Sequence, residues 1–346
     1  MATRALGTNL TLAELVRRED PDGGLADIVD VLSETNAIVM DATWIGCNDG
    51  SSHQHTRAVT EPTGAERMFG QGVTREAGVT EVVNEPTTLL AGFSEPDADM
   101  LRQQPEGWEA ARTKEDAFFI NGLTKTHVSR IFDGNRTTNP LQVNGINNRS
   151  DYNALSSDYV YDNAGGNASA TANKTSIYII QYGFKKVNMI YPRNMPNSDT
   201  GGSPIKMRDF GEVLVLDPLN TSNNAKYPAM QSWFQVAFGI DIADPRMIKR
   251  VVNISTSNID GVDDFSFDEE LLIDAYNDLE DGGMGAVIYC NRTIKSQMMK
   301  RANEKGNANF TQDREGEGPF ARPVIRFWGI PVREVAQITN TQATVS

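Results

Sequence analysis

The sequence predicts an α+β fold. Three observations support it: a long helical pattern at residues 107–132, β-branched and aromatic runs over 175–255, and alternating strand-like and helical segments over 256–346. The chain has 346 residues, and its hydrophobic share of 39% lies below that of most globular proteins. We therefore expect extensive surface, part of which becomes buried only against other chains.

Residues 1–50 are expected to form an N-terminal arm. Two short helical patterns, TLAELVRRED and DPDGGLADIVDVLSET, are separated by a Pro/Gly break, and residues 36–45 are expected to form a strand. These elements are too small to build a core by themselves. The segment has no long apolar run and no cleavage site, so we expect no signal peptide.

Residues 51–100 are expected to form an extended loop built as a β-ribbon. Its central stretch, EPTGAERMFGQGVTREAGVTEVVNEP, begins and ends near Pro62 and Pro86, contains four glycines, and carries the strand formers Val79–Val83. So few apolar residues leave the ribbon little to bury within its own subunit. We expect its partner surface to lie on another chain.

Residues 101–255 contain the strongest helix and the longest strands. Ile120, Leu123, His127 and Ile131 recur at helical spacing within residues 107–132, a length of about 39 Å, and Asp133-Gly134 is a helix stop. An Asn/Ser/Gly-rich loop is expected over 135–173, with one strand at DYVYD. The runs over 175–255 are expected to form a long antiparallel sheet.

Residues 256–346 are expected to form a smaller α/β lobe. Ser266 and Glu269 have the spacing of a capping box before a helical pattern. GAVIYC then predicts a buried strand, NRTIKSQMMKRANEKG a helix, and VIRFWGIPVREVAQI a final strand pair after a polar loop that carries DREGEG.

Charge and composition exclude several classes of protein. The net charge of -14 argues against tight binding of free nucleic acid, and no lysine precedes Lys114, so every cation of the first third is an arginine. No run of 18 apolar residues predicts a membrane span. Cys47 and Cys290 both lie in apolar sequence and are expected to be buried, reduced thiols.

Signals for catalysis are weak throughout. His53 and His55 form an H-x-H pair without the further ligand pattern of a metal site, and His127 lies on the apolar stripe of its helix. DGGMGA (281–286) lacks the Lys-Ser/Thr of a phosphate-binding loop and is expected to be a turn. We expect no catalytic, cofactor or metal residues, and we keep a soluble metal-dependent or serine hydrolase as the alternative from another class.

The order of segments resembles the major capsid proteins of tailed bacteriophages, which have the Hong-Kong-97-type shell fold, and in particular those of short-tailed phages. The resemblance rests on the arm, the ribbon ending in LLAGFSEPDADM, the helix ending in FDGN, then NPLQVNGI, YCNRTIKSQM and FWGIPVREVAQI. It implies that 51–100 is the extended loop, that 101–255 is the peripheral domain with its spine helix at 107–132, and that 256–346 is the axial domain.

The resemblance implies a structural role. Copies would assemble as hexamers and pentamers into an icosahedral head around double-stranded DNA, without sequence-specific DNA binding. Expected partners are a separate scaffolding protein, the portal protein and a decoration protein, in the host cytoplasm during assembly and in the virion afterwards. An encapsulin-type nanocompartment shell is the alternative with the same fold.

Two expectations concern contacts between subunits. Some relatives join their subunits by an autocatalytic Lys–Asn bond from the extended loop, but residues 51–100 contain no lysine, so we expect no such cross-link here. Charged and aromatic residues of the arm and loop are the candidate inter-subunit contacts. They are Arg67, Phe69, Arg75, Glu81, Glu95, Asp97, Arg17 and Arg18.

Overall fold

The computed structural model describes residues 37–105, 107–167, 173–193, 205–217, 224–257, 265–303, 309–315 and 322–346. The helical patterns expected before residue 37, together with Arg17 and Arg18, lie outside these ranges. The chain divides into two compact units. Unit 1 includes Leu89–Val128 and Met195–Ala237, and unit 2 includes Asn36–Thr88, Ser129–Asn194 and Phe238–Ser346.

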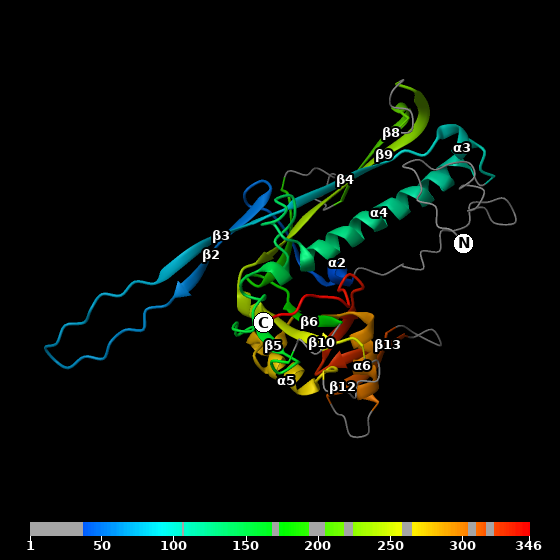
Figure 1. Ribbon diagram of the computed structural model, residues 1–346. Helices are drawn as coiled ribbons and strands as arrows, with labels where there is room; N and C mark the ends of the chain where they lie inside the picture. The colour runs from blue at the N-terminus through cyan, green and yellow to red at the C-terminus, as the bar shows by residue number, and fades with distance from the viewer. Residues whose placement is uncertain are drawn as a thin grey trace. The chain divides into compact units, whose positions relative to one another are not determined.

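Helices and strands are mixed in both units, as the predicted α+β class requires (Figure 1). The helices are α2 (Ala37–Asp41), α3 (Ala98–Arg102), α4 (Trp108–Asp133), α5 (Glu269–Asn277) and α6 (Arg292–Ala302), with short 3-10 turns η1 (Ile146–Asn148), η4 (Pro245–Met247) and η5 (Glu280–Gly283). The strands are β1 (Trp44–Gly46), β2 (Ser52–Thr60), β3 (Val79–Pro86), β4 (Thr88–Ser94), β5 (Val160–Asp162), β6 (Lys174–Gln181), β7 (Val187–Tyr191), β8 (Ile205–Leu216), β9 (Lys226–Ile242), β10 (Ile248–Ser255), β11 (Ala286–Cys290), β12 (Phe310–Glu315), β13 (Arg322–Phe327) and β14 (Ile330–Glu334).

A seven-stranded sheet forms the centre of unit 2, in the order β12-β13-β14-β11-β6-β10-β5. Strand β6 pairs antiparallel with both β10 and β11, and every one of its residues is buried. Its apolar run explains the central position, because both faces of the strand are covered. Residues of α5, α6 and the strands β10 to β14 share one hydrophobic core with β6.

This sheet joins strands from two of the expected segments of the chain. Strands β6 and β10 lie within 101–255 but pair in the same sheet as the C-terminal strands, and both compact units contain residues from 101–255. The long antiparallel pairing expected in this range is made by β8 and β9, whose register runs from Ile205↔Val236 to Leu216↔Lys226. Strand β7 pairs instead with the last residues of β9 and with β1.

Helix α4 confirms the expected long helix and its end. Ile131 and Phe132 are fully buried in unit 2, and His127 is a buried histidine on the same stripe. The last bond of the helical pattern runs from the N–H of Gly134 to the carbonyl oxygen of Arg130 at 2.8 Å, and the carbonyl oxygen of Gly134 then accepts from the N–H of Gly145 at 2.8 Å. A side chain at Gly134 would collide with backbone carbonyl oxygens, so glycine is required at this close approach.

Three local expectations are wrong. Residues 37–41 form helix α2 rather than a strand, and the chain turns immediately after it so that the indole of Trp44 donates to the carbonyl oxygen of Val39 at 3.0 Å. Helix α5 is capped by Asp268, whose carboxylate accepts from the N–H of Glu270 at 3.0 Å, and not by Ser266. The DRE of the expected polar loop belongs to β12, which pairs with β13.

Candidate inter-subunit interface

Strands β2 and β3 form a two-stranded antiparallel ribbon (Figure 1). Opposite residues include His53↔Glu85, His55↔Val83 and Arg57↔Glu81. Every residue from 58 to 82 is exposed. The ribbon is shorter than the expected 51–100, because β4 pairs in the sheet of β9 and residues 98–102 form α3.

Beyond the paired strands, the two sides of the loop are linked by polar contacts. The carboxylate of Glu76 accepts from the N–H groups of Thr63 and Gly64 at 3.1 and 3.0 Å. At the tip, the N–H of Gln71 bonds the carbonyl oxygen of Met68 at 3.1 Å. The loop therefore presents Met68 and Phe69 to solvent, with Phe69 fully exposed and Met68 76% exposed.

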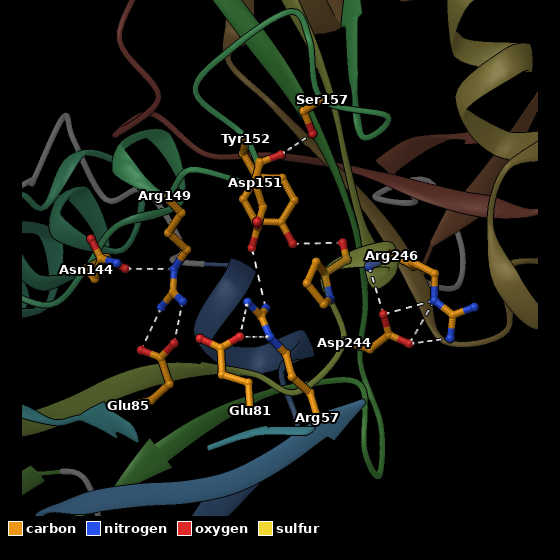
Figure 2. Close-up of polar contacts among 11 residues, drawn as sticks. Arg57, Glu81, Glu85, Asn144, Arg149, Asp151, Tyr152, Ser157, Asp244 and Arg246 are labelled. Carbon is orange, nitrogen blue, oxygen red and sulfur yellow. Dashed lines mark hydrogen bonds and ion pairs between the residues drawn. The ribbon is translucent and has the colours of Figure 1, made fainter. Parts of the chain in front are cut away.

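One face of the ribbon base is held by buried charges. Arg149 makes a two-pronged ion pair with Glu85, through Nη1 to Oε1 and Nη2 to Oε2, and its Nε donates to the carbonyl oxygen of Asn144 at 3.1 Å (Figure 2). The side chains of Arg149 and Glu85 are only 10% and 7% exposed. Nearby, His55 Nδ1 lies 2.9 Å from Oδ1 of the buried Asp241.

A second, more exposed arginine, Arg57, lies on β2. Arg57 Nε and Nη2 both lie 3.1 Å from Glu81 Oε2, and Nη1 lies 3.7 Å from Asp151 (Figure 2). The Arg57 and Glu81 side chains are 29% and 52% exposed, so water screens this pair more strongly than the buried one. The two arginines tie the ribbon to the segment 144–151.

The residue that follows this segment, Tyr152, is held by a hydrogen bond to η4. The hydroxyl of Tyr152 donates to the carbonyl oxygen of Pro245 at 2.8 Å, and burial raises the pKa of Tyr152. Asp244 caps η4 and pairs with Arg246 (Figure 2). Burial alone would raise the pKa of Asp244, but hydrogen bonds from Arg246 outweigh it and hold the pKa below its ordinary value.

Between the ribbon base and the neighbouring loops lies a polar groove of about 520 Å³. Six consecutive residues of β3, from Glu81 to Pro86, line the groove. The rest of the lining comes from residues 57, 136–137, 144, 148–151 and 242. Three arginines and three carboxylates face the groove, namely Arg57, Arg136, Arg149, Glu81, Glu85 and Asp151.

The predicted contact residues fall into separate places. Arg67, Phe69 and Arg75 lie together on the exposed loop of the ribbon, and Glu81 pairs with Arg57 at its base. In unit 1, Glu95 accepts from the side-chain amide of Gln231 at 2.6 Å, and Asp97 caps α3. The groove residues Arg136 and Arg149 were not predicted, because neither belongs to a sequence pattern.

The cysteines and the H-x-H pair are the remaining residues with candidate chemistry. Cys47 and Cys290 are buried free thiols, as predicted, and burial raises their pKa to about 11 and about 12, which keeps both protonated and unreactive. His53 and His55 lie on β2 rather than in a loop. Among the described residues, no group of three or more His, Cys, Asp or Glu is arranged to hold a metal ion.

No helix within the described ranges is both long enough and apolar enough to cross a membrane.

Comparison with known proteins identifies the family. The chain resembles the cryo-EM structure of bacteriophage Epsilon15, with 27% identity, a TM-score of 0.72 and 98% of each chain covered. It resembles the bacteriophage JBD30 capsid at 10% identity and a TM-score of 0.46, covering 95% of this chain and 99% of that one. An encapsulin complex of Synechococcus elongatus follows at 9% identity and a TM-score of 0.41, covering 74% and 94%.

No curated protein sequence matches the chain. The family model described as major capsid protein GP7 matches residues 20–346, nearly the whole sequence. The expected resemblance to tailed-phage capsid proteins is therefore confirmed, and it is favoured over the encapsulin alternative. The chain belongs to the major capsid protein GP7 family.

Proposed function

We propose that this capsid protein assembles as hexamers and pentamers into the icosahedral head of a tailed phage, and that the head encloses a double-stranded DNA genome. The observation that carries the proposal is the exposed ribbon. Residues 58–82 bury nothing of consequence within their own subunit, and the loop ends in two exposed apolar side chains. Such a segment gains stability only when another chain covers it.

The ribbon is suited to contact a neighbouring subunit because its base is fixed and its tip is apolar. Full burial of a Met or Phe side chain stabilises an interface by about 1.5–3 kcal/mol. A closed shell repeats such contacts in every copy, so modest individual contributions accumulate. Arg67, Phe69 and Arg75 are proposed to contact the neighbour directly.

The remaining predicted contacts are proposed with smaller roles. Glu81, Glu95 and Asp97 already have partners within their own units, so each would add a contact at the rim of an interface. Residues 51–100, 101–255 and 256–346 are proposed to act as extended loop, peripheral domain and axial domain, with β6 and β10 joining the sheet of the last. The arm, with Arg17 and Arg18, is proposed to reach another subunit.

Partners follow from the same role. We propose a scaffolding protein during assembly in the host cytoplasm, the portal protein at one vertex, and a decoration protein on the finished virion. The packaged DNA is enclosed without sequence recognition, since a chain of net charge -14 repels phosphate. The chain's part is mechanical, and no catalytic step is assigned to it.

Light scattering on the purified protein tests this function, with wild type expected to form capsomers or megadalton shells. The variant Phe69→Ser should lower the yield of shells. The matched control is Leu141→Ser, which replaces another apolar side chain that is 78% exposed, outside the ribbon. Wild-type protein that stays a monomer of 38.0 kDa under all assembly conditions would contradict the proposal, and equal loss in both variants would remove the role of Phe69.

A further inference from the structure

The groove beside the ribbon base has an unusual wall. Among the described residues the ribbon sheet has two strands, so β3 pairs with β2 on one side and no described strand pairs with its other edge. Six consecutive residues of β3 line the groove, although neighbouring side chains of a strand point to opposite faces. The groove therefore runs along the edge of β3, where main-chain groups are presented.

The contacts of Asn48 show which main-chain groups these are. Asn48 Oδ1 accepts from the N–H of Gln54 at 2.8 Å, and Asn48 Nδ2 donates to the carbonyl oxygen of Gln54 at 2.6 Å. Both main-chain groups of Gln54 thus point away from β3, so Gln54↔Asn84 is a pair without ladder hydrogen bonds. Because such pairs alternate along an antiparallel ladder, Thr56↔Val82 is another.

It follows that Val82 and Asn84 direct their N–H and C=O groups to the free edge of β3, into the groove. Thr56 directs its own groups to the opposite edge, that of β2. An unpaired edge of this kind is a template for an extended peptide, which adds a strand through main-chain hydrogen bonds.

The charges in the groove narrow the choice of partner. Glu85 is paired with Arg149, and Glu81 and Asp151 are paired with Arg57. Arg136 is exposed and has no ion-pair partner among the described residues. The groove thus offers one cation that can pair with a carboxylate of an incoming peptide.

We propose that the free edge of β3 receives an extended segment of a second copy of this chain, which adds a third strand beside Val82 and Asn84 and places a carboxylate against Arg136. A second copy is the occupant that fits, because the chain carries 46 Asp and Glu against 32 Lys and Arg and so supplies carboxylates on its own surface. The inference rests on the proposed function, since only an assembled particle brings copies together at this density.

Hydrogen–deuterium exchange, read at single amides by fragmentation mass spectrometry, tests the added strand. The amides of Val82 and Asn84 should exchange rapidly in unassembled subunits and roughly 100-fold or more slowly in wild-type shells, since a hydrogen bond in a stable interface opens rarely. The amide of Thr56, on the other edge of the same residue pair, serves as the internal control and should change little.

Two proline variants provide the matched functional test. Val82→Pro removes a donor at the free edge of β3, and Thr56→Pro removes the equivalent donor at the edge of β2, while neither removes a β2–β3 ladder bond. Val82→Pro should reduce shell yield at least about tenfold relative to Thr56→Pro, the factor that corresponds to about 1.4 kcal/mol per assembled contact. Arg136→Gln should reduce shell yield and make the remaining yield less sensitive to salt.

Different results would contradict the added strand at β3 and the proposed assembly into a shell. Wild-type shells in which the Val82 amide still exchanges rapidly would overturn the added strand and leave the capsid role intact. Protection that appears only when a different protein is added would overturn the second copy as the occupant. Failure of wild-type protein to assemble at all would contradict the proposed function, and the inference would fall with it.

Discussion

Replacing Glu85 by alanine should destabilise unit 2 strongly, because it leaves the guanidinium of Arg149 buried without its counter-charge. The two side chains are 7% and 10% exposed and meet through two parallel N–H to oxygen contacts. Removing one partner of a buried ion pair costs about 3–5 kcal/mol, well above the value of the contact itself. We therefore expect Glu85→Ala to lower the free energy of unfolding by about 3 kcal/mol or more.

The matched control is Glu81→Ala. Glu81 lies four residues earlier on the same strand and also pairs with an arginine, but it is 52% exposed and its partner Arg57 is 29% exposed. An exposed pair contributes about 0–1 kcal/mol. Both variants remove a carboxylate from β3, so a difference between them measures burial rather than strand propensity.

A double variant separates the charge from the packing. Glu85→Leu combined with Arg149→Met removes both charges and keeps apolar volume, so it should cost less than Glu85→Ala alone. The assay is urea unfolding of unassembled subunits, followed by circular dichroism, with all four proteins at the same concentration. Equal costs for Glu85→Ala and Glu81→Ala would refute the reasoning that burial makes the first pair important.

Three further predictions follow from local features. Gly134→Ala should lower the free energy of unfolding by about 1–3 kcal/mol, because its Cβ would lie 2.6 Å from a backbone carbonyl oxygen. Gly122 in α4 has open space around it, so Gly122→Ala should raise the free energy of unfolding by up to about 1 kcal/mol in the same urea assay. Asp244→Ala should lower the free energy of unfolding by about 1 kcal/mol at neutral pH. Because the folded-state pKa of Asp244 is lowered, this stabilisation is present above the ordinary pKa of about 4 and is lost as the pH falls through the folded-state pKa. Unfolding curves of wild type and variant from pH 7 to pH 3 measure this loss. Boiling assembled particles in detergent should release a single band of 38.0 kDa, because residues 51–100 contain no lysine, and a ladder of covalent oligomers would contradict this.

Elements with a strong local pattern were predicted correctly. The stripe of Ile120, Leu123, His127 and Ile131 gave the helix within one residue at each end, since α4 runs from Trp108 to Asp133. The ribbon was predicted from its prolines, glycines and the run Val79–Val83, and β3 begins at Val79. In both cases the information lies within a few neighbouring residues.

Features that depend on distant partners were not predictable in this way. Strands β6 and β7 follow one another in the chain and have similar composition, yet they enter different sheets. The apolar run in α2 is too short for its periodicity to distinguish a helix from a strand. Arg149 and Glu85 are 64 residues apart and belong to no motif, so their ion pair at the ribbon base could not be found from the sequence.

Cryo-electron microscopy of the assembled protein tests the central claim most directly. We expect closed icosahedral shells in which residues 58–82 of each copy are covered by a neighbouring copy. Particles in which this ribbon stays exposed, or a protein that forms only monomers or small oligomers, would contradict it.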